Sequence, residues 1–260
     1  MTRAIGLAAL TVLELPHVEL VATAAQAGYS HVGLRLIPVA GQPHQHALDV
    51  AALERRLADT DVRVLDVEVF RLSPQTRVAA FEATLAIAAH LKASELLVHG
   101  ADPDEARLID NFGRLCDLAG RYGLNANLEP MPWVEVSGIA KAARIVSSVS
   151  KRNAALLVDA IHFFRAGDSL AELAKLPREA FRYVQLCDAR PERPADMQEI
   201  IRQARADRLP PGEGGLDLRG LLAALPQDLP VSLEVPLARS LSPLEKAKLV
   251  YQAALKVLNP

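Results

Sequence analysis

The chain lacks the features that mark several large protein classes. It has only two cysteines, Cys116 and Cys187, far apart in apolar surroundings, so we expect two reduced thiols rather than a disulfide. No apolar run approaches the roughly 18 residues that cross a membrane. The first residues lead directly into a strand pattern, without the apolar segment of a signal peptide. We therefore expect a cytoplasmic protein.

Excess charge and aromatic side chains are also scarce. The formal net charge is −2, which gives no reason to expect binding to nucleic acid or to a membrane surface. Aromatic residues make up 4% of the chain, and Trp133 is its single tryptophan. A pocket built from stacked rings for a large ligand is therefore disfavoured. We expect a small, polar, sugar-like substrate, and homo-oligomers through exposed helices are compatible with the composition.

What the chain does have is a regular alternation of two patterns. Half of its 260 residues are hydrophobic, and short apolar runs bounded by Gly, Pro or Asp are typical of buried parallel strands. The predicted strands are Ala4–Leu10, His31–Leu36, Val62–Phe70, Glu95–His99, Leu124–Glu129, Ala155–Asp159, Arg182–Cys187 and Leu229–Val235. Helical patterns lie between them, at Val18–Ala27, Ala47–Ala58, Thr76–Leu91, Asp104–Arg121, Ser137–Val149, Ser169–Leu176, Leu218–Leu225 and Ser242–Leu258.

This alternation predicts an α/β protein, a single (β/α)8 TIM barrel over residues 1–260. The structural alternative is an open doubly wound sheet, which normally carries a Gly-rich loop after its first strand. That loop here reads Ala8-Ala9-Leu10-Thr11 and has no such glycines. The least regular stretch is 189–216, rich in Pro, Arg and Gly, which we expect to be a long connection on the catalytic face.

Four polar side chains end four successive late strands: Glu129, Asp159, Gln185 and Glu234. Active sites of such barrels lie at the carboxyl ends of the strands. Three carboxylates brought together there would repel one another unless a cation lay among them. The pattern therefore predicts a site for one divalent ion (Mg, Mn, Co or Zn) held by these four residues.

Each of these residues also has a simpler interpretation. Glu129 and Glu234 could face solvent, Asp159 could be a helix N-cap, and Gln185 could be hydrogen-bonded inside the barrel. His162, three residues after Asp159, could be an ordinary loop histidine.

Further polar residues lie at or just after strand ends: Arg35, Glu68, His99, His162, Asp188, Arg208 and Glu213. Arg208 precedes a Gly-rich loop and could neutralise a substrate carboxylate or phosphate, or be a solvated surface charge. His44 and His46 have a metal-like H-x-H spacing, although a solvent-facing lid is the favoured interpretation.

The second half of the chain resembles the xylose-isomerase-like superfamily of sugar isomerases, epimerases and dehydratases. The segments concerned are Leu-Glu-Pro at Glu129, Val-Asp-x-x-His at Asp159, Glu-Val-Pro at Glu234, and the stretch Pro-Gly-Glu-Gly-Gly-Leu-Asp-Leu that begins at Pro211. The resemblance implies the same metal ligands, with Gln185 where many members have His, as in hydroxypyruvate-isomerase-type proteins. The endonuclease IV branch is disfavoured, because it needs many histidines and this chain has seven.

The resemblance also implies roles in binding and catalysis. His162 and Arg208 would contact the substrate, Asp188 would lie near it, and Glu68 and His99 would line the pocket. Glu129 and Glu234 would exchange a proton with an enediolate.

The predicted function is a metal-dependent isomerase or epimerase of a small sugar or hydroxy-keto acid. Two alternatives stay open: a dehydratase of an inosose- or dehydroshikimate-type substrate, and a barrel that binds a sugar without catalysis.

Overall fold

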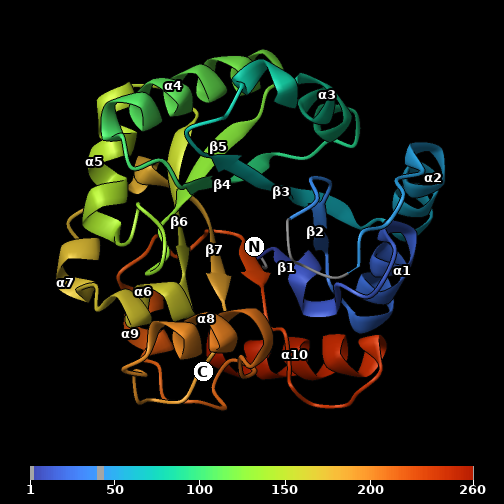
Figure 1. Ribbon diagram of the computed structural model, residues 1–260. Helices are drawn as coiled ribbons and strands as arrows, with labels where there is room; N and C mark the ends of the chain where they lie inside the picture. Colours follow the sequence, from blue (N-terminus) through green and yellow to red (C-terminus); the bar gives the residue numbers. More distant parts are fainter. Residues whose placement is uncertain (1–2, 40–43, 260) are drawn as a thin grey trace.

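The computed structural model describes residues 3–39 and 44–259, in which eight parallel strands close into a barrel in sequence order. Strand β1 pairs with both β2 and β8, which completes the closure. Helices surround the strands (Figure 1). The strands are Ile5–Leu7 (β1), His31–Arg35 (β2), Arg63–Leu72 (β3), Glu95–Gly100 (β4), Asn125–Glu129 (β5), Ala154–Asp159 (β6), Phe181–Leu186 (β7) and Val231–Leu233 (β8). The predicted TIM barrel is confirmed.

The helices follow the strands around the outside of the barrel (Figure 1). The α-helices are His17–Ala27 (α1), Val50–Thr60 (α2), Glu82–His90 (α3), Glu105–Arg121 (α4), Ile139–Val149 (α5), Ala160–Ala166 (α6), Leu170–Leu173 (α7), Met197–Ala206 (α8), Leu218–Ala223 (α9) and Pro243–Leu258 (α10). Short 3-10 helices lie at Ala9–Val12 (η1), Val78–Phe81 (η2) and Arg178–Ala180 (η3). Within the described residues, no helix is long and apolar enough to cross a bilayer.

Local sequence signals explain where many helices begin and end. Asp104 caps α4 by accepting a hydrogen bond from the Arg107 amide. Ser242 and Glu245 form a reciprocal capping box at the start of α10, where Pro243 fits because its missing N–H needs no partner. Gly28 ends α1 with φ of 94°, a left-handed conformation that glycine adopts without strain.

Several expected boundaries are wrong, for identifiable reasons. Helix α5 has no side-chain cap from Ser137; the distant Asp168 carboxylate accepts from the Ile139 amide instead. The expected helix at Thr76–Leu91 is split into η2 and α3, and that at Ser169–Leu176 shrinks to α7. Stretch 189–216 is also more regular than expected, since it contains α8, which Asp196 caps.

Apolar side chains form two groups. The larger fills the space between the barrel and its helices. The smaller consists of Leu65, Val69, Leu97, Leu157 and Tyr183 on β3, β4, β6 and β7. Three of these precede His99, Asp159 and Gln185 by two positions, so they share the same face of their strands. The strand-end polar residues therefore lie above an apolar layer inside the barrel.

Candidate active site

The four predicted metal ligands lie together at the carboxyl end of the barrel. Glu129 ends β5, Asp159 ends β6, Gln185 is the penultimate residue of β7, and Glu234 follows β8 directly. All four are buried. Asp159 pairs in register with Gln185, and the Gln185 amide donates to Glu234 Oε1 at 3.3 Å. Their roles in metal binding stay predictions, but none of them faces solvent.

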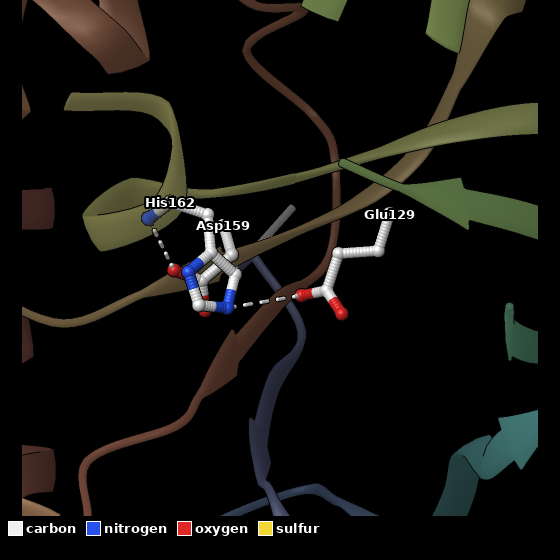
Figure 2. A group of neighbouring side chains, drawn as sticks. All are labelled: Glu129, Asp159 and His162. Carbon is white, nitrogen blue, oxygen red and sulfur yellow. Dashed lines mark hydrogen bonds and ion pairs between the residues drawn. The ribbon is translucent and has the colours of Figure 1, made fainter. Parts of the chain in front are cut away.

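A histidine from the first turn of α6 joins this group. Ligand atoms of Glu129, Asp159 and His162 lie within 4.8 Å of one another. His162 Nε2 is 3.9 Å from Glu129 Oε1, and the His162 backbone amide donates to Asp159 Oδ1 at 3.2 Å. Figure 2 shows the imidazole of His162 directed towards Glu129. Asp159 is thus also the N-cap of α6. His162, expected in a loop, lies in the first turn of that helix, and its ring packs against Trp133.

Arg208 lies between two of the carboxylates. Its Nη1 is 2.6 Å from Asp159 Oδ2, and its Nη2 is 2.7 Å from Glu234 Oε2. The side chain is buried, so the solvated alternative is excluded. Because the Arg208 cation outweighs the effect of burial, the pKa of Asp159 is lowered. The pKa of Glu234 is raised to about 8, since its burial outweighs Arg208.

A second acid–histidine pair stands beside this group. His99 Nε2 lies 2.7 Å from Glu129 Oε2. Burial lowers the pKa values of His99 and His162 to about 3, so both imidazoles are neutral near neutral pH. Burial, followed by the nearby Asp159 carboxylate, raises the pKa of Glu129 well above its usual range. Neutral histidines next to buried carboxyls can accept, hold and pass on protons.

These residues open into a cavity of about 350 Å³. Glu68 and Arg35 line it and form an ion pair of 2.7 Å. The predicted site residues among its lining are Arg35, Glu68, His99, Glu129, His162, Arg208 and Glu234. The structure therefore gathers most of the candidate list around one space that can hold a small ligand.

Asp188 is placed elsewhere. Its carboxylate accepts hydrogen bonds from the backbone amides of Ala189, Gly212 and Leu216, at 2.8 to 3.0 Å. It is not among the residues that line the cavity. Its expected substrate contact therefore finds no support, because both oxygens are used to fold stretch 189–216. Glu213 pairs with Arg239 on the exposed surface.

The histidines of the H-x-H motif lie beside a neighbouring hollow. His44 and His46 line it together with His17. Nε2 of His17 and Nε2 of His46 lie 3.1 Å from the backbone oxygens of Arg35 and Leu13. Among the described residues, the ligand atoms of these three histidines do not converge to within 4.8 Å.

The donor set fits a hard divalent ion. Glu129 Oε1 and Gln185 Oε1 are buried, and within residues 3–39 and 44–259 neither oxygen has a hydrogen-bond donor. A buried acceptor without a partner is costly, and a cation would relieve that cost. Each carboxylate oxygen has two lone pairs, so Asp159 and Glu234 can serve Arg208 and an ion together. Glu129, Asp159, Gln185 and Glu234 would hold the ion, with His162 within reach.

Two cavity residues were missed from the sequence, Arg71 and Arg205. Arg71 follows the end of the predicted third strand, which extends further than expected, and Arg205 lies near the end of α8, which was not expected at all. Both line the cavity with Arg35. The three arginines act on His99 electrostatically and contribute to lowering its pKa. No motif marked Arg71 or Arg205, because a surface arginine is common and only the fold brings these two exposed side chains to the cavity.

Comparison with known proteins identifies the family. A profile described as "Xylose isomerase-like TIM barrel" matches residues 21–260, so the chain belongs to this family. The chain is 30% identical over 136 residues to a 3-dehydroshikimate dehydratase of Pseudomonas aeruginosa, and 26% identical to one of Pseudomonas putida. The matched segment covers 51% of this chain and only 21% of each dehydratase.

Solved structures share the fold over nearly the whole chain. The IOLI protein with a bound zinc atom is 18% identical with a TM-score of 0.81, and the match covers 98% of both chains. D-allulose 3-epimerase from Methylomonas sp., in complex with D-allulose, is 20% identical with a TM-score of 0.73, again over 98% of both chains. Proteins that share this fold thus include an epimerase and a protein that holds a zinc atom.

Proposed function

We propose that this protein is a divalent-metal-dependent enzyme that removes a proton next to the carbonyl group of a small hydroxylated keto acid. The observation that carries the proposal is one cavity lined by buried glutamates, Glu129 and Glu234 among them, and by the four arginines Arg35, Arg71, Arg205 and Arg208. Buried glutamates can exchange protons with carbon and oxygen. Arginines at the same cavity suit a substrate that carries a carboxylate.

Dehydration is the outcome we favour. The cationic lining suits a carboxylated substrate better than a neutral sugar, and the dehydratases to which the chain is similar are named for the acid 3-dehydroshikimate. Loss of water from that compound would need one group to accept the carbon-bound proton and another to protonate the leaving hydroxyl. A bound divalent ion would polarise the carbonyl oxygen and stabilise the negative charge that develops there.

The chain's own residues can divide these tasks. Glu129 has one oxygen free of protein donors and the other at His99, so this pair can accept a proton and share it. Glu234, which also lines the cavity, can return a proton to the leaving group once it has taken one up. His162, neutral and packed edge-on against Trp133, is held where it can orient the substrate.

Isomerisation or epimerisation is the second candidate. It uses the same proton abstraction but returns the proton to carbon, for which two glutamates from separate strands, β5 and the end of β8, are well placed. The structural similarity to D-allulose 3-epimerase supports this alternative at the level of the fold.

The test is to incubate the purified protein with Mn²⁺ and either 3-dehydroshikimate or D-allulose in deuterated water. Formation of an aromatic dihydroxybenzoate by loss of water supports the dehydratase. Deuterium next to the carbonyl without loss of water supports the isomerase or epimerase. Glu129→Gln should abolish either signal. A wild type that binds the ion yet shows neither reaction, with a panel of related keto acids and ketoses as well, would favour a non-catalytic barrel.

A further inference from the structure

Arg208 is held by the protein on every nitrogen of its guanidinium. Besides its two carboxylate contacts, Nε donates to the Ala204 carbonyl at 2.7 Å and Nη1 to the Glu234 carbonyl at 3.1 Å. Nη1 also lies 3.4 Å from Cys187 Sγ. These contacts leave one Nη2 hydrogen without a protein acceptor among the described residues. An arginine so fixed is poorly suited to reach for a substrate.

The backbone around Arg208 is anchored as firmly as its side chain. Its amide donates to the Pro236 carbonyl at 3.1 Å, and the next residue, Leu209, forms an antiparallel bridge with Asp188. Ala204, which accepts from Nε, belongs to α8. Stretch 189–216 therefore holds the Arg208 guanidinium in place at the carboxyl end of the barrel.

The two carboxylates that Arg208 joins come from opposite sides of one strand. Asp159 ends β6, Glu234 follows β8, and β7 with Gln185 runs between them. Both carboxylates are buried, and like charges in such surroundings repel strongly. The planar guanidinium fork can hold both at fixed positions, which a flexible lysine ammonium would not do as well.

We propose that Arg208 is a positioning residue, an internal counter-cation that sets the spacing of Asp159 and Glu234 for the ion and keeps the site assembled without it. This rests on the proposed function only where the ion is concerned. Removing one partner of a buried ion pair leaves an uncompensated buried charge, which is strongly destabilising. The metal-free protein should therefore depend on Arg208 more than on any other buried arginine.

Arg165 offers a matched control. It is also fully buried, but its Nη2 bonds only to neutral oxygens, the Arg190 carbonyl at 2.7 Å and Gln203 Oε1 at 3.2 Å. Arg208→Met and Arg165→Met remove the same buried side-chain volume, although Arg208 makes five side-chain hydrogen bonds and Arg165 makes two. Only the former leaves two buried carboxylates without their cation.

The experiment measures melting temperature with EDTA and with added Mn²⁺. In EDTA, Arg208→Met should melt lower than Arg165→Met by on the order of 10 °C. Added Mn²⁺ should raise its melting temperature more than that of the wild type, because the ion then supplies the missing charge. Equal losses for the two variants in EDTA would overturn the proposal.

A double variant covers the case in which Arg208→Met does not fold. Arg208→Met in a Glu234→Gln background removes one of the repelling charges, and it should recover folded protein or melt higher than the single Arg208 variant. No recovery would count against the counter-cation role. A wild type that binds no Mn²⁺ would refute the metal-dependent function, while the EDTA comparison would still decide the role of Arg208.

Discussion

Asp66 shows how costly a buried carboxyl group can be in this barrel. It is fully buried on β3, and neither of its oxygens has a hydrogen-bond partner in the described part of the chain. Burial, followed by the charges of Glu68 and Glu234, raises its pKa well above the usual range. Asp66 therefore keeps its proton in the folded protein at a pH where the unfolded chain has already lost it.

This has a definite effect on stability. A folded-state pKa above the unfolded value of about 3.9 means that unfolding releases a proton, so stability falls as pH rises. The free energy of unfolding falls by up to about 1.4 kcal/mol per pH unit until the Asp66 carboxyl of the folded protein itself ionises. Asp66→Asn cannot ionise. Denaturant unfolding in EDTA measures the free energy of unfolding of both proteins. The value for Asp66→Asn should rise relative to that of the wild type as the pH is raised from about 5 to about 8.

The control for Asp66 is Asp59→Asn, at an exposed position of α2. This variant shows the effect of removing one exposed carboxylate over the same pH range. If Asp66→Asn behaves in the same way, Asp66 is ionised in the folded protein, and a partner must hold its charge.

The two cysteines are predicted to be unreactive in the native state. Cys116 and Cys187 are free and buried, which confirms two thiols among the described residues rather than a disulfide. Burial raises the pKa of each thiol to about 12, so almost no reactive thiolate exists near neutral pH. Titration with a thiol reagent should find no fast-reacting group in the folded protein and two after denaturation. Rapid labelling of either cysteine in the native state would contradict this.

At the scale of the element, Asp188 and the glycines after it explain the Pro-Gly-Glu-Gly-Gly motif. A Cβ at Gly214 would lie 2.3 Å from both the Ala189 carbonyl oxygen and Asp188 Oδ1, too close for any other residue. The motif therefore serves the folding of the loop around the Asp188 carboxylate. That loop in turn holds Arg208 in place.

Changing this loop should expose it to proteases. Gly214→Ala forces the backbone away from Asp188, so trypsin should cut within 189–216 faster than in the wild type, as it should in Asp188→Ala. Gly113→Ala is the control, because a Cβ there meets only Val149 at an ordinary 3.6 Å. Cleavage rates for Gly214→Ala that match those of Gly113→Ala would mean that the loop tolerates the displacement.

The elements also show what sequence reasoning can reach. The order of strands and helices follows from hydrophobic pattern, and strand-end polar residues such as Glu129 and Asp159 were found because parallel strands point their carboxyl ends the same way. The pattern does not reveal which neighbour each side chain finds. Asp188 looked like a ligand-shell carboxylate but bonds to backbone amides of its own loop. Helix α8 was missed because Pro and Arg around it obscure a short amphipathic segment.

At the scale of the whole molecule, charge is distributed unevenly. The chain carries a formal net charge of −2, yet four arginines line the cavity, against the three glutamates Glu68, Glu129 and Glu234. Arg71 and Arg205 are exposed, so they can meet a ligand as it enters. A cluster of one sign at a concave site raises the local concentration of oppositely charged ligands and speeds their association.

The arginine cluster should therefore control which substrates are accepted. Arg71→Gln combined with Arg205→Gln should raise KM for the proposed carboxylated substrate by about tenfold, the effect of losing charge-assisted hydrogen bonds, with kcat little changed. Wild-type kcat/KM should fall as salt is added, because salt screens exposed charges, and the double variant should lose most of that dependence.

The matched control is Arg55→Gln combined with Arg63→Gln. These two arginines are exposed and lie away from the cavity, and their loss changes the net charge equally. If both double variants raise KM alike, net charge rather than the cavity attracts the substrate. If neither changes KM, the substrate carries no carboxylate at this position, and a neutral hydroxy-ketone becomes the better candidate.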